Sequence, residues 1–292
     1  MKKTFKTIIS IILCVLLTTG ILVFVVVSTL NAAIFSGNFL SDISDSQDYS
    51  NMVMSAIQKD VEAQSSYVGI PADVLLEGFD KEILQVKLNE YVKTTVDFLN
   101  YRADFIQMDF PDDFFIPPLT AFLESEASAN DYVPTDEQYK LIEEVSWDTS
   151  KIIEKHIDLF QLKLLSKATF FKELHHRLYF AGQMGLPALW VILICISCLF
   201  MLHGFDTGSA LFLQFTSFWT AGCLISIPMT VLGSLQLTTR LAIETPYLKY
   251  AVDTVLTNVS DFALFLGILL FILSSIGLTI SFFKKYCIYL DN

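Results

Sequence analysis

The sequence predicts an all-α integral membrane protein with four transmembrane helices and a helical-bundle extracytoplasmic domain between the first helix and the second. The first observation is the distribution of charge, because four long windows lack Asp, Glu, Lys and Arg altogether. These windows hold 35, 28, 33 and 22 residues, and they follow Lys6, Arg177, Asp206 and Asp261. A helix needs about 20 apolar residues to cross a bilayer, so each window is long enough. The second observation is that strand-like alternation of apolar and polar residues is absent elsewhere.

The four windows place transmembrane helices at 8–34, 178–202, 210–235 and 262–283. Three lysines precede the first helix, as in a signal peptide, but its apolar stretch exceeds the roughly 7–15 residues of a signal-peptide core. The residues at 31–33, Asn-Ala-Ala, also make a poor cleavage site. We therefore expect the first helix to be an uncleaved signal anchor.

Orientation follows from the lysines near both ends of the chain, because positive residues stay on the cytoplasmic side. These lysines are Lys2, Lys3, Lys6, Lys284 and Lys285. Cytoplasmic segments are then expected at 1–7, 203–209 and 284–292, and extracytoplasmic ones at 35–177 and 236–261. The protein is predicted to be a multi-pass protein of a cell membrane, and its Lys-, Ile- and Phe-rich composition suggests a bacterial plasma membrane.

The segment predicted to lie outside is strongly acidic. Residues 35–175 carry 26 Asp and Glu against 11 Lys and Arg, a net charge of −15. Such a segment repels nucleic acid and anionic lipid head groups, so no nucleic-acid partner is expected. The charge could attract cationic peptides, cell-wall amines or divalent cations, or it could simply keep the domain soluble. None of the five cysteines falls in this segment, so its stability must come from a hydrophobic core without disulfides.

Apolar spacing predicts three main helices in the acidic segment. The first covers 45–64, and the second runs from Pro71 to about residue 101. The third begins at Thr135, which forms a capping box with Gln138, and continues unbroken through 135–181 into the second transmembrane helix, because no Pro or Gly interrupts it. Glycines 182 and 185 and the proline at 187 are then positioned to kink the chain.

A proline- and aromatic-rich connector spans 104–133, with a short helix expected at 119–127. Its phenylalanines either tuck under the helices or form an exposed contact patch. The residues of this possible patch are Phe105, Phe110, Asp112, Asp113, Phe114 and Phe115. The smaller outer segment, 236–261, contains an apolar helix starting at Thr245-Pro246, which could lie at the membrane interface or pack under the larger domain.

Candidate catalytic or metal-binding groups are sparse. His175 and His176 are adjacent and point about 100° apart on a helix, so they cannot share one metal ion. His156 lies on an apolar helix face, which is typical of a hydrogen-bonded core histidine. The aspartates at 109, 112 and 113 lack the glycine and final glutamate of a calcium loop. We therefore predict no catalytic residue, no cofactor and no metal site.

Two functions fit this layout. In the first, a non-enzymatic protein binds or senses a ligand or partner with its outer domain and acts through membrane-embedded partners. The order of one span, an outer helical domain and a second span resembles the periplasmic half of bacterial chemoreceptors. In the second, the chain is an accessory subunit of a transport or export complex. Both imply the lipid bilayer and either a protein partner or a homo-oligomer as the partners.

Overall fold

The computed structural model describes residues 2–204, 207–234 and 242–290. Residues 205–206 of the predicted cytoplasmic loop and 235–241 near the predicted outer segment lie outside the described residues, as do the side chains from position 284 onward. The described chain is all-helical, with no strand in these ranges. It divides into two compact units. We call them the apolar unit (Met1–Ser36, His176–Leu241 and Asp253–Asn292) and the acidic unit (Gly37–His175 and Ala242–Val252).

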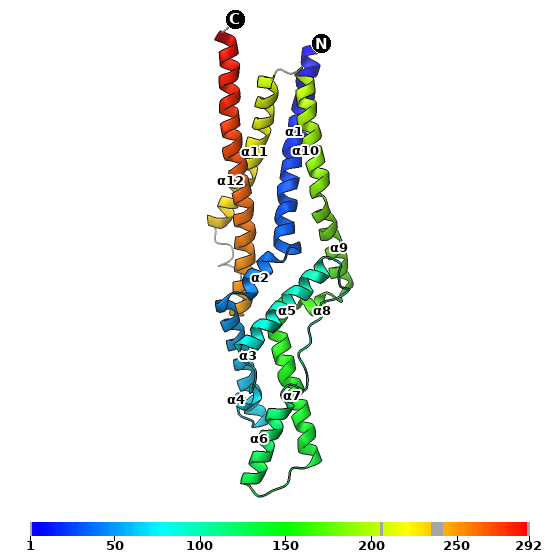
Figure 1. Cartoon of the computed structure of the whole chain (residues 1–292), viewed down its shortest axis with the longest axis vertical. Helices are drawn as coiled ribbons and strands as arrows, with labels where there is room; N and C mark the ends of the chain where they lie inside the picture. Colours follow the sequence, from blue (N-terminus) through cyan, green and yellow to red (C-terminus); the bar gives the residue numbers. More distant parts are fainter. Residues whose placement is uncertain (1, 205–206, 235–241, 291–292) are drawn as a thin grey trace. The chain divides into compact units, whose positions relative to one another are not determined.

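Four helical stretches of the described chain are long and apolar enough to cross a membrane: Thr4–Ser44, Thr169–Leu202, Thr207–Ser234 and Pro246–Phe283. The helices that build them are α1 (Lys2–Leu30), the π-helix Asn31–Phe35, α2 (Asn38–Ser44), α9 (Thr169–Gln183), α10 (Gly185–Leu202), α11 (Thr207–Ser234) and α12 (Pro246–Leu290). Within the apolar unit α1 packs on both α10 and α11. Figure 1 shows α1, α10, α11 and the later part of α12 running side by side.

A small core holds α1, α10 and α11 together. Leu17 and Leu199 are fully buried there, beside Ile21, Cys195 and Ala221. Cys195, which forms a C-x-x-C pair with Cys198 in the sequence, therefore serves as a packing side chain. Other faces of the same helices expose large apolar side chains, an arrangement that suits a hydrocarbon solvent better than water.

Helices α11 and α12 approach closely at two glycines. A Cβ atom added to Gly222 would lie 2.8 Å from the backbone nitrogen of Phe271 and 3.0 Å from the carbonyl oxygen of Gly267. A Cβ added to Gly267 would lie 2.9 Å from the side chain of Ile225. Only hydrogen atoms fit at this crossing, which is how small residues let membrane helices pack by van der Waals contact.

Seven α-helices of the described chain lie wholly within the acidic unit, which also holds the first parts of α9 and α12. They are α2 (Asn38–Ser44), α3 (Gln47–Val68), α4 (Ala72–Leu75), α5 (Lys81–Leu99), α6 (Ile116–Ala129), α7 (Asp136–Ile157) and α8 (Leu162–Leu165), with a 3-10 turn at Leu159–Gln161. The long helix α3 packs on α5 and α7, and α6 packs on α7. The spacing of Val53, Ile57 and Val61 along α3 places all three in the core.

Local capping fixes where several of these helices begin. The Thr135 hydroxyl accepts a hydrogen bond from the Gln138 backbone N–H, and the Gln138 side chain accepts one from the Thr135 N–H, so the predicted capping box is confirmed. The Asp80 carboxylate accepts from the second and third N–H groups of α5. Gly69 ends α3 in the left-handed region, at φ 77°.

The prediction of an unbroken helix across 135–181 was wrong. Helix α7 ends at Ile157, and the helical geometry breaks at Phe160 and Gln161, whose φ angles are +60° and +55°. The cause lies elsewhere in the sequence. The Asp158 carboxylate accepts hydrogen bonds from the Tyr91 hydroxyl, with the oxygens 2.8 Å apart, and from the Lys163 backbone N–H over 3.0 Å. It thereby satisfies a backbone donor that a continuing helix would have used.

The prediction of one helix from Pro71 to residue 101 was also wrong. Helix α4 stops at Leu75, Gly78 takes φ +84°, and α5 starts only after Asp80. Phe79, between them, is 4% exposed, and its burial explains the interruption. Conversely, the helix expected after Thr245 is present but is not separate, because α12 continues from Pro246 to Leu290.

Candidate functional site

The connector phenylalanines mostly form core rather than surface. Phe110 and Phe115 are 2% and 0% exposed, and their rings pack with Phe114 at centroid distances of 5.0 and 4.9 Å. Phe79 covers the other side of Phe110 at 5.6 Å. Of the predicted contact patch, only Phe105 presents a substantially exposed ring. Phe110 and Phe115 are therefore tucked into the core, whereas Phe105, Phe114 and the two aspartates of the predicted patch keep exposed surface.

The nearby aspartates bind lysines. The Asp112 carboxylate lies 3.3 Å from the Lys151 ammonium, and Asp109 lies 3.3 Å from that of Lys163. Both lysines also reach the buried Glu154 carboxylate, at 3.2 and 3.4 Å. Asp113 is exposed. These pairs tie the connector to α7 and α8, and no group of three metal-ligating side chains occurs among the described residues.

A different site emerges where α3, α7 and the start of α12 meet inside the acidic unit. It is a cleft of about 670 Å³ with both polar and apolar walls. Its lining residues are Asn51, Met52, Ser55, Ala56, Lys59, Asp60, Lys155, His156, Glu244, Thr245, Pro246 and Tyr247. Three segments that are far apart in the sequence therefore form one concave surface. This volume falls within the range of roughly 300–1,000 Å³ that small-molecule sites occupy.

A hydrogen-bonded chain of three side chains lies at this cleft. His156 is 6% exposed, and its Nε2 atom lies 2.9 Å from an Asp60 oxygen. Its Nδ1 atom lies 3.0 Å from the Tyr247 hydroxyl oxygen. Lys155 adds an ammonium group 3.0 Å from the same Asp60 oxygen. An ionised carboxylate only accepts, so Nε2 carries the imidazole proton and the Tyr247 hydroxyl donates to Nδ1.

The surroundings favour this arrangement of protons. Burial lowers the pKa of His156, and this effect outweighs the hydrogen bond to Asp60, which raises it. Burial alone would raise the pKa of Asp60, but the hydrogen bonds from Lys155 and His156 hold that pKa below its usual value. A neutral imidazole thus joins an ionised carboxylate on α3 to a phenol on α12, and both of its nitrogens are engaged within the protein.

The first turns of α12 belong to the core of the acidic unit. Tyr247 is 6% exposed and Ala251 is 0% exposed. Tyr49 of α3 packs edge-on against Tyr247, at a centroid distance of 6.4 Å, and stacks on Tyr250 at 6.2 Å. The Ser46 and Tyr250 hydroxyl oxygens are 2.8 Å apart. The sequence left two positions open for this helix, at the membrane interface or packed under the larger domain. The start of the helix packs against α3 of the larger domain.

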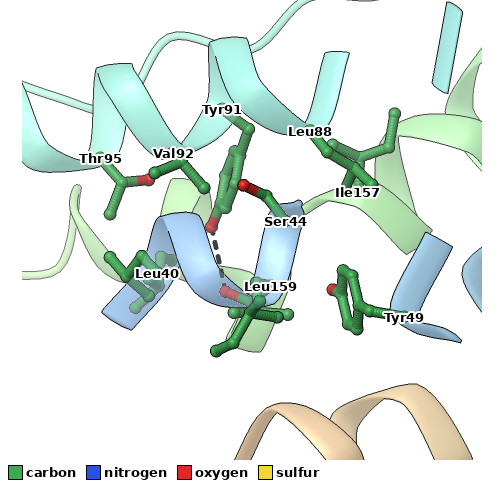
Figure 2. A pocket seen from close by; sticks show the side chains of 11 residues that line it. Leu40, Ser44, Tyr49, Leu88, Tyr91, Val92, Thr95, Ile157 and Leu159 are labelled. Atoms are coloured by element: carbon green, nitrogen blue, oxygen red, sulfur yellow. Dashed lines mark hydrogen bonds between the residues drawn. The ribbon is translucent and has the colours of Figure 1, made fainter. Parts of the chain in front are cut away.

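A second hollow, lined by residues of α2, α3, α5, α7 and the turn that follows α7, is much smaller (Figure 2). Its free space for a water-sized molecule is about 20 Å³, which suits a single water molecule. Figure 2 shows the Tyr91 hydroxyl bonded to the Leu159 carbonyl oxygen, at 3.0 Å. The Tyr49 hydroxyl is buried with no hydrogen-bond partner among the described residues. This hollow is therefore a packing gap with a polar atom at its wall.

The other histidine singled out in the sequence also has a structural role. His175 is 4% exposed, and its Nε2 atom lies 2.8 Å from the Leu99 carbonyl oxygen. Its ring stacks on Tyr101 at 4.4 Å and packs on Phe98 at 4.8 Å. These contacts hold the end of α5 against the start of α9.

Sequence reasoning identified His156 as a core histidine, which the structure confirms, but it missed both of its partners. Asp60 is 96 positions and Tyr247 is 91 positions away along the chain, so no local pattern could pair them. The only usable signal was the helix start at Thr245-Pro246 followed by Tyr247 and Ala251 on its apolar face. The chain matches no known family model, no curated protein and no solved structure at a significant level.

Proposed function

We propose that this chain is a non-enzymatic, multi-pass membrane protein whose acidic unit is an extracytoplasmic helical-bundle domain. In this proposal the domain binds a ligand or partner at the cleft between α3, α7 and α12, and the protein acts through membrane-embedded partners. The charge-free windows within the long apolar helices and the lysines at both ends support the topology. The packing of α3 on α5 and α7 supports the bundle.

One observation carries the proposal. Tyr247 closes the hydrogen-bonded chain at the cleft, and the helix that supplies it continues without a break to Leu290. The same helix contains one of the four long apolar stretches, Pro246–Phe283. A ligand that binds more tightly to one position of the first turn of α12 than to another would therefore shift the whole helix towards that position. The size of the shift is set by the difference in affinity for the two positions. Both His156 nitrogens are engaged, which favours a binding role over proton transfer.

Labelling of single cysteines in intact cells tests the topology. The five native cysteines are replaced, and cysteine is introduced at Tyr67, which is 92% exposed on α3, or at Lys3 near the N-terminus. An impermeant maleimide is expected to label Tyr67→Cys in intact cells and Lys3→Cys only after the membrane is permeabilised. The opposite pattern would overturn the assignment of the acidic unit to the extracytoplasmic side.

Purification in mild detergent tests the dependence on partners. A self-associated chain, or a stoichiometric membrane partner without transport activity, supports the sensing proposal. A translocating ATPase or permease that co-purifies would contradict it in favour of an accessory subunit of a transport or export complex.

A further inference from the structure

The cleft defined above also restricts the chemistry of what it binds. We infer that it takes a small zwitterion, a molecule of amino-acid to short-peptide size with one carboxylate and one ammonium group. This inference rests on the proposed function, because it assumes that the cleft is the ligand site of the acidic unit. Its volume of about 670 Å³ leaves room for such a molecule, whereas the hollow at Tyr49 admits only water.

The charges that line the cleft are balanced in sign. Two are cationic, Lys59 and Lys155, and two are anionic, Asp60 and Glu244. Lys155 and Asp60 already pair at 3.0 Å. Lys59 and Glu244 are exposed and form no ion pair within the described part of the chain. One cation and one anion therefore remain available to a ligand.

This balance disfavours ligands that carry only one sign of charge. A simple anion would meet Lys59 but would also face Glu244 and Asp60, within a segment whose net charge is −15. A simple cation would meet Glu244 but would face Lys59 and Lys155. A zwitterion pairs with Lys59 through its carboxylate and with Glu244 through its ammonium group. Complementarity of this kind selects a ligand mainly by repelling the others.

The rest of the lining suits a small polar ligand with a short apolar part. Met52, Ala56 and Pro246 give apolar surface, whereas Asn51 and Ser55 offer exposed hydrogen-bonding groups on α3. The start of α12 also opens onto the cleft, and the positive end of its helix dipole adds to the attraction of a carboxylate.

Three dipeptide probes test the inference on the full-length protein in detergent. Alanyl-alanine has both charges, N-acetyl-alanyl-alanine has only the carboxylate, and alanyl-alanine amide has only the ammonium group. We expect alanyl-alanine to raise the midpoint temperature of unfolding and each blocked probe to bind at least tenfold more weakly. Equal binding of the acetylated probe would show an anion site, and equal binding of the amide would show a cation site. Either result would overturn the inference that the ligand is a zwitterion, but the cleft would still be a ligand-binding site.

Matched variants locate the binding site. Lys59→Gln and Glu244→Gln are each expected to weaken alanyl-alanine binding at least tenfold, because each removes one charge partner. Both residues are exposed, so neither change should prevent folding. Lys140→Gln, an exposed position on α7 outside the cleft lining, is the control and should bind normally. Absence of binding by all three probes would overturn the inference, whereas the topology and partner tests would still decide the proposed function separately.

Discussion

Replacing Tyr247 with phenylalanine removes one oxygen atom and leaves the aromatic ring in place. The lost hydroxyl donates to His156 Nδ1 over 3.0 Å, and both side chains are 6% exposed. Although both residues line the cleft, little of either side chain is exposed, so we expect the imidazole nitrogen to lose its partner without full replacement by water. The ring contacts with Tyr49 and His156 persist, so little apolar area is lost. We expect the variant to lose about 1–3 kcal/mol of stability, the usual cost of a buried group without a partner.

Tyr250→Phe is the matched control on the same helix. Its hydroxyl lies 2.8 Å from that of Ser46, but both side chains are partly exposed, so water can take over the lost bond. The expected loss is therefore smaller, about 0.5–1 kcal/mol. Unfolding of the full chain by urea in detergent is followed by the fluorescence of Trp147, the tryptophan of α7, after Trp190→Phe and Trp219→Phe changes remove the other two.

Two results would refute this reasoning. The first is an equal loss of stability in Tyr247→Phe and Tyr250→Phe. The second comes from a double-mutant cycle: in a His156→Leu background, removal of the Tyr247 hydroxyl should cost less than in the parent chain. An unchanged cost would mean that the hydroxyl does not act through His156.

Three further predictions concern packing, a buried hydroxyl and pH. Gly222→Ala should destabilise the full chain by about 1–3 kcal/mol in SDS-induced unfolding, because its Cβ would meet the Phe271 backbone. The Cβ atom added by Gly233→Ala would have no neighbour within 4 Å in the described structure, so this control should be neutral or stabilising by up to about 1 kcal/mol. Equal effects of the two changes would contradict the close crossing of α11 and α12. Tyr49→Phe should stabilise the acidic unit by about 1 kcal/mol in urea unfolding, because it removes a buried hydroxyl that has no partner in the described structure. A loss of stability would contradict this and would indicate a water molecule bound to the hydroxyl. Burial lowers the pKa of His156 in the folded protein, so the unfolded chain binds this proton first as the pH falls. The stability of the folded chain should therefore decrease as the pH drops through about 6.5. His156→Gln should remove this part of the pH dependence.

The apolar helices and the capped helix starts were predictable from sequence because their causes are local. Charges are excluded from a bilayer wherever a helix crosses it, so a charge-free window is visible in the sequence itself. Thr135 and Gln138 are three positions apart, and the capping box that they form depends on no other part of the chain.

The helix breaks and the cleft were not predictable because their causes are distant in the sequence. The helix break before Phe160 is accompanied by a hydrogen bond between Asp158 and Tyr91, which are 67 positions apart. The cleft likewise needs Asp60, His156 and Tyr247 from three separate helices. Helical spacing shows which face of a helix is apolar, but it does not show which side chains meet across two faces.

The central claim is that α12 connects events at the cleft to the apolar unit. The most direct measurement is the mobility of a nitroxide attached at Phe265→Cys, an exposed position of α12, in the full chain in vesicles. Ala251→Trp, at a fully buried site, displaces the first turns of α12, and Tyr247→Phe is the milder change. Both variants should change the mobility at Phe265→Cys and leave it unaltered at Val15→Cys, an equally exposed position on α1. Unchanged mobility at Phe265→Cys in both variants would contradict the account.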